Sequence, residues 1–520
     1  MTALHAIEVE VVRHLFSSIA EEMGATLMRS AFSPNIKERR DYSCAIFDAD
    51  ARMIAQAAHI PVHLGSTPMS VRAALDAFPD LASGQHVLLN DPFAGGTHLP
   101  DLTLVTPVHD ASGQPIFYVA NRAHHSDVGG ISPGSLPLST SIDDEGIRIP
   151  PTLWSEDLER EIMAASRTPD ERRGDLLAQI AANQRGATRL REAFAARGPS
   201  LLTASSELMG YAERVIREVL SGAPDGTWSF EDALDGDGHD PRHLRVHCVV
   251  TIEGADLTVD LRGCDDQVRG PVNVPRAVSV SAALYALRCL APEGAPSNHG
   301  MMRPLTVLTR AGSLADAVYP AAVAAGNVET SQRLTDCILG ALAQALPDRI
   351  PAASCGSMNN VLIGGEDHRP GRAGEPFTYY ETIAGGAGAA RGVHGASGAH
   401  THMTNTLNTP AEELERAYPF RLERYAIREG SGGAGRWRGG DGVVRAYAFD
   451  APATVTLMTE RRALAPWGLA GGSPGAMGRN LLVRDGVERV LPAKCTVEVR
   501  AGDVVVVETP GGGGWGAPAT

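Results

Sequence analysis

The N-terminal part of the chain alternates between apolar patterns of helical period and of strand period. Apolar residues recur every three or four positions over residues 7–31, which predicts an amphipathic helix that ends before Pro34. Residues 41–57 contain two short apolar runs around a turn, and residues 69–78 again have helical spacing. We therefore expect helices packed on strands in this part of the chain.

Two further apolar runs, residues 102–108 and 116–120, flank the turn-like segment Asp110-Ala-Ser-Gly113. Runs of this length on either side of such a turn are typical of an antiparallel β-hairpin. In a hairpin, the residues just before the first strand and just after the second come together in space. The side chains at these two ends are therefore expected to be neighbours.

Helical patterns dominate residues 154–221, and alternation of apolar and polar residues dominates residues 227–261. The chain from Tyr418 onward is rich in strands and glycine turns. These patterns predict an α+β fold of mixed, multi-domain type with antiparallel sheets. We divide it into an N-terminal region with the candidate metal site, a helical segment, an α/β core with glycine-rich active-site loops and a β-rich C-terminal region, at residues 1–150, 151–225, 226–415 and 416–520.

The chain has 520 residues, of which 43% are hydrophobic, and this is enough for several domains with their own cores. Its net charge is -15 and it has no basic run, so we expect neither nucleic acid nor a membrane surface as a partner. No apolar run approaches the roughly 18 residues of a transmembrane helix. Seven cysteines are spaced singly, without a CxxC pair or a signal pattern, which indicates a reducing, cytoplasmic location.

Side chains that bind divalent metals are concentrated at the two ends of the predicted hairpin. His98 and Asp101 stand three residues apart before its first strand, and His124 follows its second strand. Pairing of the strands would bring two imidazoles and one carboxylate to one point and leave room for water. Three protein ligands with an open position are typical of a catalytic rather than a structural site. These ligand types fit Zn, Mn or Fe, so the spacing does not choose the metal.

Other polar residues near this site have less distinctive surroundings. Glu38 and Asp41 belong to a charged segment between two apolar ones, and we interpret them either as a further metal ligand or base or as part of a solvated turn. His59 and His63 flank a short loop and are interpreted as ordinary loop residues, with a ligand role as the alternative. Glu145, in an acidic turn, is a secondary acid–base candidate.

Residues 381–410 combine many glycines with a polar run. The run contains His400, His402, Asn405, Thr406 and Asn408. Glycine permits close backbone approach, and a flexible linker is one interpretation of such a segment. Linkers seldom hold two histidines and two asparagines among threonines. We therefore expect this run to form a second wall of the active site.

Motifs for phosphate binding and for a serine nucleophile are missing from the sequence. No G-x-x-x-x-G-K-[ST] loop occurs, since neither Lys37 nor Lys494 follows such a glycine pattern. Two G-x-S-x-G strings begin at Gly130 and Gly471, but in each the serine is followed by proline, which lacks the N–H that an oxyanion hole requires. If the reaction uses ATP, another component must bind it.

Taken together, these segments resemble the hydantoinase B/oxoprolinase family. The matching stretches include RSAFSPNIKERRDYSCAIFDADARMIAQAAHIPVHLGS, LNDPFAGGTHLPDLTLVTPV, NRAHHSDVGGISPGS, THMTNTLNTP and TPGGGGWG, and they follow the family's order over nearly the whole chain. The family includes B subunits of ATP-dependent N-methylhydantoin amidohydrolases, the second half of 5-oxoprolinases, and the corresponding subunits of acetone and acetophenone carboxylases.

The resemblance implies a two-component enzyme that forms a hetero-oligomer. Its ATP-binding component is a hydantoinase A-type ATPase subunit, which phosphorylates the carbonyl oxygen of a small cyclic amide. This chain supplies the metal centre where the activated ring is hydrolysed. In the family's carboxylases a His-x-x-Asp pair and a later histidine hold the metal. His98, Asp101 and His124 match this pattern, with Glu38 as the fourth position.

For the ring-opening step, His125 or Asp127 is expected to accept a proton while the other residue orients His124. Two alternatives to a cyclic amidohydrolase stay open. One is a subunit of an ATP-dependent acetone- or acetophenone-type carboxylase. The other is a metal-stabilised scaffold that only docks the ATPase subunit.

Overall fold

The computed structural model describes residues 6–57 and 60–518, and its first sheet is built around the predicted hairpin. Strands β4 (Asp101–His109) and β5 (Pro115–His124) pair antiparallel with Asp101 opposite His124, which confirms the hairpin. Strand β1 (Tyr42–Asp48) pairs with the other side of β5. Strands β2 (Met53–Gln56), β3 (Val87–Leu89) and β6 (Thr152–Leu153) complete a six-stranded sheet of order β2-β1-β5-β4-β3-β6.

Long helices cover this sheet. Helices α1 (Ala6–Ser30), α5 (Pro169–Arg197) and α6 (Ser200–Ser221) pack on one another, and α5 lies against β4 and β5. Phe16 of α1 meets Phe117 of β5 edge to face, with ring centroids 5.8 Å apart, and both side chains are buried. Full burial of one such side chain stabilises the fold by about 1.5–3 kcal/mol, so this pair helps to fix α1 on the sheet. The helices predicted at the N-terminus and within residues 154–221 are confirmed.

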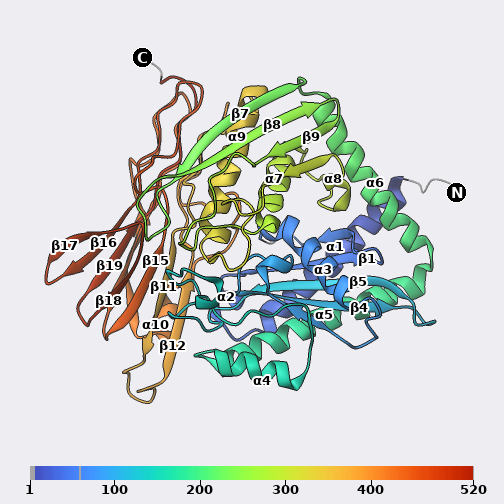
Figure 1. The fold of residues 1–520 in the computed structure, drawn as a ribbon, viewed down its shortest axis with the longest axis horizontal. Helices are drawn as coiled ribbons and strands as arrows, with labels where there is room; N and C mark the ends of the chain where they lie inside the picture. The colour runs from blue at the N-terminus through green and yellow to red at the C-terminus, as the bar shows by residue number, and fades with distance from the viewer. Residues whose placement is uncertain (1–5, 58–59, 519–520) are drawn as a thin grey trace.

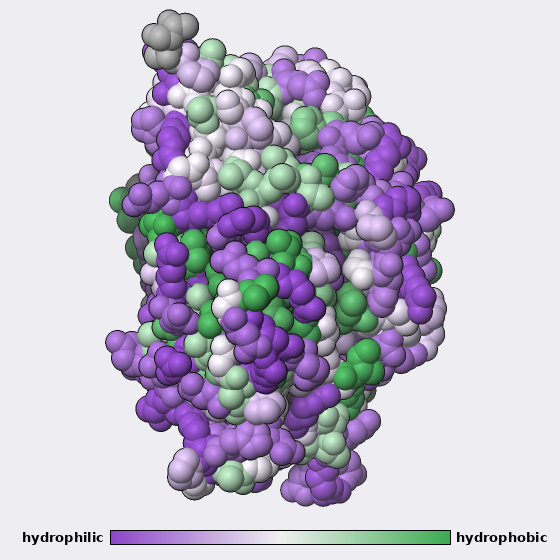
Figure 2. All heavy atoms as spheres, turned by 90° about the vertical axis from the view of Figure 1, so that its left-hand side faces the viewer, coloured by the Kyte–Doolittle hydropathy of each residue, from purple (hydrophilic) through white to green (hydrophobic). Residues whose placement is uncertain are grey.

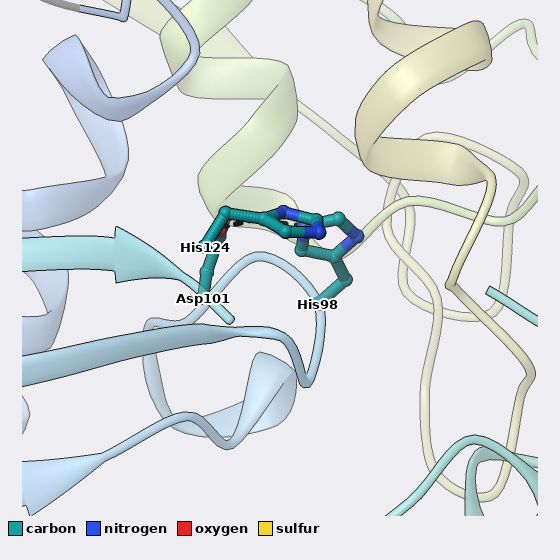
Figure 3. A group of neighbouring side chains, drawn as sticks. All are labelled: His98, Asp101 and His124. Carbon is teal, nitrogen blue, oxygen red and sulfur yellow. Dashed lines mark ion pairs between the residues drawn. The ribbon is translucent and has the colours of Figure 1, made fainter. Parts of the chain in front are cut away.

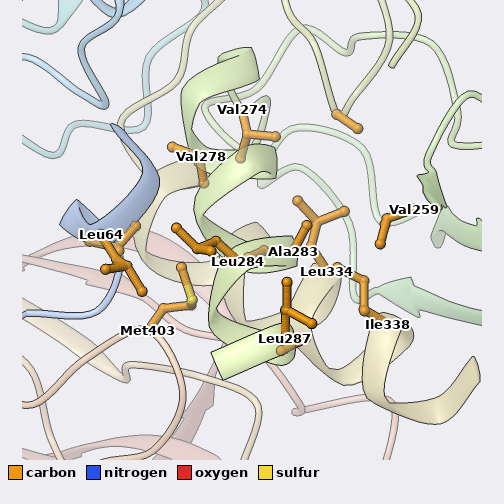
Figure 4. Close-up of a cluster of buried hydrophobic side chains, with 14 of the residues drawn as sticks. Leu64, Val259, Val274, Val278, Ala283, Leu284, Leu287, Leu334, Ile338 and Met403 are labelled. Carbon is orange, nitrogen blue, oxygen red and sulfur yellow. The ribbon is translucent and has the colours of Figure 1, made fainter. Parts of the chain in front are cut away.

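The middle of the chain forms a second layer around helices α7 (Arg276–Leu290) and α9 (Ser331–Ala345). In Figure 4 the apolar side chains of α7 stand between Leu64 of α3 (His63–Ala77) and Leu334 and Ile338 of α9. A four-stranded sheet covers α9 and is antiparallel except for its last pair. Its strands are β7 (Gly226–Leu234), β8 (Leu244–Glu253), β9 (Asp256–Asp260) and β10 (Leu305–Leu308).

Two antiparallel sheets form the C-terminal part, at the left of Figure 1. The first is made of β11 (Asn360–Glu366), β12 (Pro376–Glu381), β15 (Ala453–Met458) and β18 (Lys494–Val499), in the order β12-β11-β15-β18. The second is made of β13 (Phe420–Ile427), β14 (Val443–Phe449), β16 (Arg479–Arg484), β17 (Val487–Leu491) and β19 (Val504–Glu508), in the order β13-β14-β19-β16-β17. The two sheets share one apolar core, so they fold as one unit.

The glycine-rich segments pack against one another instead of forming linkers. Backbone hydrogen bonds join them, such as Gly512 N–H to Gly440 O and Gly440 N–H to Ala387 O, both 2.9 Å long. A Cβ added to Gly439, Gly440 or Gly512 would come closer than 3.0 Å to a neighbouring backbone carbonyl. Only glycine permits this spacing, so the interpretation of residues 381–410 as a flexible linker is wrong.

The side of the molecule that carries β16, β17 and β19 exposes several apolar side chains. Figure 2 looks onto this side and shows apolar residues scattered among polar ones. Val487 and Val490 of the edge strand β17 are 68% and 71% exposed. Apolar groups at a sheet edge are available for contact with another chain.

The fold is α+β, as predicted, with 31% helix, 25% strand and four sheets. The predicted boundaries stay a prediction. One buried cluster contains Phe47, Ile216, Leu334 and Met458, one residue from each predicted region. None of the described helices is both long and apolar enough to cross a membrane. The remaining elements are α2 (Pro34–Lys37), α4 (Glu156–Ala165), α8 (His299–Met302), α10 (Ala411–Ala417), η1 (Pro92–Ala94), η2 (Ile142–Asp144) and η3 (Gly326–Thr330).

Candidate metal centre

The hairpin brings His98, Asp101 and His124 together (Figure 3). All three are buried, and one possible ligand atom from each lies within 4.8 Å of the others. Asp101 Oδ2 is 3.4 Å from His98 Nε2, and Asp101 Oδ1 is 3.3 Å from His124 Nδ1. Around a four-coordinate ion with bonds of about 2.1 Å, neighbouring ligand atoms stand about 3.4 Å apart. These donors therefore have the spacing of a metal's ligand set.

Strand register and a tight loop place these three side chains. Asp101 is the first residue of β4 and pairs with His124, the last residue of β5. In the loop before β4, Asp101 N–H donates to His98 O at 3.1 Å, and His125 N–H donates to Pro100 O at 2.9 Å. The first of these bonds folds His98 back over Asp101, and the second ties the loop to the end of β5.

Two further residues complete the cluster. His63, in the first turn of α3, has Nε2 3.3 Å from Asp101 Oδ2. Asn327, in the π-helical turn η3, has Nδ2 3.1 Å from His98 Nε2, and its buried Oδ1 has no hydrogen-bond partner among the described residues. The interpretation of His63 as a loop residue is therefore wrong, while His59 lies outside the described residues. Asn327 follows no sequence pattern, although π-helical turns recur at functional sites.

Contacts behind the cluster orient its imidazoles. His98 Nδ1 faces Ala324 O at 3.1 Å. A ring nitrogen that donates to a carbonyl carries the proton, which puts the lone pair of His98 on Nε2, beside Asn327 Nδ2 and Asp101 Oδ2. His124 stacks on Tyr380 with ring centroids 4.4 Å apart, and its buried Nε2 has no partner among the described residues. Of these two nitrogens, His98 Nε2 contacts the amide of Asn327, and His124 Nε2 has no hydrogen-bond partner among the described residues.

The electrostatics of the cluster match the needs of a cation. Burial alone would raise the pKa of Asp101, but the nearby His98 and His63 outweigh burial and hold this pKa well below its usual range. Burial lowers the pKa of His124 and of His63. Burial opposes the positive form of His98 too, yet Asp101 outweighs it and raises that pKa. Burial thus favours the neutral forms of His63 and His124, while Asp101 favours a proton on His98. A divalent cation would displace that proton and balance the same carboxylate, so the donor set fits such an ion.

A cavity of about 20 Å³, which is enough for a water molecule or an ion, is lined by the cluster residues His63, Asp101, His124 and Asn327. Asp41 lines the same cavity, and its backbone oxygen accepts the N–H of His124 at 3.0 Å. Burial raises the pKa of Asp41, while His124 and Arg39 act in the opposite direction. Of the residues predicted to act as acids or bases, Asp41 is the one that faces the cluster.

Glu38, predicted as a fourth ligand or base, lies at the surface. It follows the last residue of α2, is half-buried, and lies within electrostatic reach of Arg416 on α10. Arg40, which stands between the two acids, has a left-handed backbone with φ of 57°, and only Asp41 lines the cavity. His63 and Asn327 stand beside Asp101 in the place predicted for Glu38.

His125 and Asp127 also point away from the cavity. His125 faces α5, with Nε2 2.9 Å from Gln179 Oε1. Successive residues at the end of a strand face opposite sides of the sheet, which turns His125 away from the side that His124 occupies. Asp127 accepts the backbone N–H of Arg167 at 2.6 Å and pairs with Arg167 Nη1 at 2.9 Å. The expectation that either residue accepts a proton or orients His124 is corrected by this placement.

Replacement of Asp127 by asparagine is expected to lower stability without reducing metal content. Asp127→Asn keeps one oxygen for the N–H of Arg167 but removes the ion pair with its guanidinium. A hydrogen bond to a charged group contributes about 1.5–3 kcal/mol, which sets the expected loss in the free energy of unfolding. Chemical denaturation and elemental analysis measure the two quantities. If the variant loses metal while its stability stays unchanged, Asp127 does contribute to the metal site.

Glu145 is fully buried behind the cluster and braces it. Its Oε1 accepts hydrogen bonds from Ser139 Oγ at 2.7 Å and from the backbone N–H groups of Val323 and Ala324 at 2.8 and 3.0 Å. The carbonyl of Ala324 is the group that faces His98. Glu145 therefore holds the turn that orients His98, a different role from the acid–base group predicted.

The Glu145→Gln variant is expected to change how stability depends on pH. Burial raises the pKa of Glu145 to about 7, above its ordinary value of 4.5. The stability that this carboxyl contributes is present below pH 4.5 and is lost as pH rises to 7, because the folded state then holds a proton that the unfolded state has released. Glutamine does not titrate. The free energy of unfolding of the variant should therefore rise relative to that of the wild type over this pH range, by up to about 3 kcal/mol. Denaturation of metal-free protein at several pH values measures this, and a difference that is flat with pH would contradict it.

The sequence model of the hydantoinase B/oxoprolinase family matches residues 5–518. The chain therefore belongs to this family, as its motifs indicated.

Individual relatives and one solved structure agree with this assignment. The 5-oxoprolinase 1 of Arabidopsis thaliana is 38% identical over 98% of this chain, which spans only 42% of that protein. A putative D-/L-hydantoinase B subunit of Pseudomonas sp. (strain NS671) is 30% identical, with 98% of this chain and 90% of that one covered. The crystal structure of an ATP-dependent caprolactamase from Pseudomonas jessenii has a TM-score of 0.91 and 28% identity, with 99% of this chain and 92% of that one covered.

Proposed function

We propose that this chain is the metal-bearing catalytic component of an ATP-dependent cyclic amidohydrolase of the hydantoinase B type. It would open a hydantoin- or lactam-type ring after a partner chain has phosphorylated the ring. The observation that carries the proposal is the buried cluster of His98, Asp101 and His124 at ligand spacing. Its occurrence in a family whose members include proteins named as a 5-oxoprolinase and as a hydantoinase component supports the choice of reaction.

We assign different roles to the residues around the cavity. His98, Asp101 and His124 would hold a divalent ion, Zn, Mn or Fe, with His63 or Asn327 beside them. When bound, such an ion supplies Lewis acidity toward a carbonyl and a water of lowered pKa. Asp41 holds or releases a proton at the same cavity, since burial moves its pKa upward, toward the range where a carboxyl exchanges protons in catalysis.

A partner that binds ATP is part of the proposal. The sequence has no phosphate-binding loop, and one relative of matching length is named as one subunit of a hydantoinase. The Arabidopsis 5-oxoprolinase has more than half of its length outside the region that this chain spans. The exposed apolar side chains of β17 support contact with a hydantoinase A-type ATPase chain. No disulfide joins the cysteines of the described residues, which supports action in a reducing compartment, the cytoplasm.

Co-expression with an adjacent ATPase gene tests the function directly. The complex is expected to consume ATP in step with ring opening of a hydantoin, 5-oxoproline or a lactam, without bicarbonate. ATP turnover that requires bicarbonate would favour the carboxylase alternative. Removal of the metal should stop turnover while the complex stays assembled, whereas dissociation with turnover by the remaining ATPase would favour the scaffold alternative.

A further inference from the structure

Three threonine side chains form the wall of the cavity that faces the metal-binding cluster. Thr382, Thr404 and Thr406, called the threonine wall below, are 1%, 5% and 4% exposed and line the cavity together with His63, Asp101 and His124. Thr382 Oγ1 is 2.6 Å from Thr406 Oγ1, which is 3.4 Å from Thr404 Oγ1. A hydrolytic site does not need three adjoining buried hydroxyls for packing, since valine has nearly the same shape.

A buried arginine stands directly behind the threonine wall. Arg39 is fully buried, and its Nη2 donates to Thr382 Oγ1 at 2.9 Å. Its Nη1 donates to Tyr380 O at 2.8 Å and also to Asn35 Oδ1, while Nε has no hydrogen-bond partner among the described residues. The carboxylate recorded beside it, Asp41, is 3.9 Å away, too far for a hydrogen bond. Glu381 lies within electrostatic reach of Arg39, and Arg39 Cζ is 4.8 Å from the centroid of the Tyr380 ring. The guanidinium still places a buried positive charge directly behind Thr382.

Counting hydrogen atoms shows what the threonine wall offers to the cavity. The three hydroxyls carry three hydrogens, and the two contacts between them use at most two. Arginine has donors only, so its bond to Thr382 uses none of the three. No carbonyl or carboxylate is recorded as an acceptor for these hydroxyls among the described residues. At least one O–H therefore remains to donate into the cavity.

The charge of the groups around the cavity and the volume of the cavity indicate the kind of ligand atom that it receives. A free O–H backed by a guanidinium favours an acceptor that carries negative charge. A volume of about 20 Å³ admits one such atom, not a whole ring. Asp41 and Asp101 line the same space and would repel an anion, so a cation on the cluster is required to balance them.

We infer that the threonine wall is a binding site for an anionic oxygen of the ligand, a phosphoryl or carboxylate oxygen placed between the metal and the hydroxyls. Arg39 is a positioning residue, because it acts through Thr382. This inference rests on the proposed function, since it needs the divalent ion. It gives the chain a means to recognise a phosphorylated ring or its ring-opened acid, in addition to the metal.

Anion binding to the metal-loaded chain tests the inference. Inorganic phosphate and formate serve as probes of the two oxygen types, and calorimetry measures their affinities for the wild type, Thr406→Val and Thr406→Ser. Thr406→Val should lower the affinity for one or both anions by about 10- to 100-fold, which corresponds to the loss of a hydrogen bond to a charged group, and Thr406→Ser should keep the affinity of the wild type. An effect on phosphate alone assigns the phosphoryl oxygen, and an effect on formate alone assigns the carboxylate oxygen.

Controls separate this site from general damage and from the metal site. Thr378→Val changes a threonine of β12 that is 2% exposed, has an unpartnered hydroxyl among the described residues and does not line the cavity, so anion affinity should stay unchanged. Thr404→Val replaces Thr406→Val if the latter does not fold. If the metal-loaded Thr406→Val and Thr404→Val proteins bind both anions as tightly as the wild type, the inference about the threonine wall is wrong and the proposed function is unaffected. Wild-type protein that binds no divalent metal would overturn the proposed function together with it.

Discussion

Replacing Gly512 by alanine is expected to prevent the chain from reaching its native state. The added Cβ would lie closer than 3.0 Å to the backbone carbonyl of Ala387 and to the backbone nitrogen of Gly388. Neither neighbour is a flexible side chain, because both belong to a segment that is itself hydrogen-bonded within the glycine array. Alanine stiffens the unfolded chain by only about 0.4–1 kcal/mol, far less than the 4–5 kcal/mol or more that mark severe core disruption. Soluble yield and the melting temperature measure the outcome.

Gly210→Ala is the matched control for this substitution. Gly210 lies inside α6, and a Cβ there meets only the end of the Arg214 side chain at 3.4 Å. Alanine in a helix interior is favoured over glycine by about 1 kcal/mol, so this variant should be as stable as the wild type or more stable. A Gly512→Ala protein that melts with the wild type would show that the glycine segments are not packed as described.

The core of the candidate site could be predicted because one hairpin carries it. His98, Asp101 and His124 fall within a single supersecondary unit, and strand alternation with turn chemistry is enough to bring its two ends together. The same local argument failed for His125 and Asp127. Whether a residue beyond the end of a strand turns toward the site or toward α5 depends on tertiary contacts such as Gln179 and Arg167.

The position of His63 beside Asp101 was not predicted, because the start of α3 was placed too late in the sequence. The helix was predicted over residues 69–78, but α3 begins at His63 and contains Pro68. The hydroxyls of Ser66 and Thr67 donate back to the carbonyls of Val62 and His63 in the first turn. The helix therefore runs through its proline, and its first residue faces Asp101 instead of a loop.

Other parts of the site depend on contacts between distant segments. Asn327 is 226 residues from Asp101 along the chain, and no pattern around it distinguishes it from a helix cap. The expectation of a second wall in residues 400–408 placed Thr406 near the site, but His402 pairs with Asp336 instead, at 3.2 Å. The packed glycines come from four separate segments, so glycine content alone suggested a linker equally well.

Replacing Asp101 by asparagine is expected to abolish stable metal binding and, with it, turnover. Asp101 lies within 3.3–3.4 Å of His63, His98 and His124, so it supplies both a ligand atom and the negative charge that balances the cation. Replacing a residue that only hydrogen-bonds to a metal ligand lowers metal affinity by about 10–100-fold, so replacing the ligand itself should lower it by more than about 100-fold. Asp110→Asn, at the turn of the same hairpin, is the control, since Asp110 bonds to turn residues such as Ser112 and Gln114. Elemental analysis after dialysis and calorimetric titration with Zn, Mn and Fe compare the variants. An Asp101→Asn protein that keeps a full equivalent of metal would show that the cluster is not the metal centre.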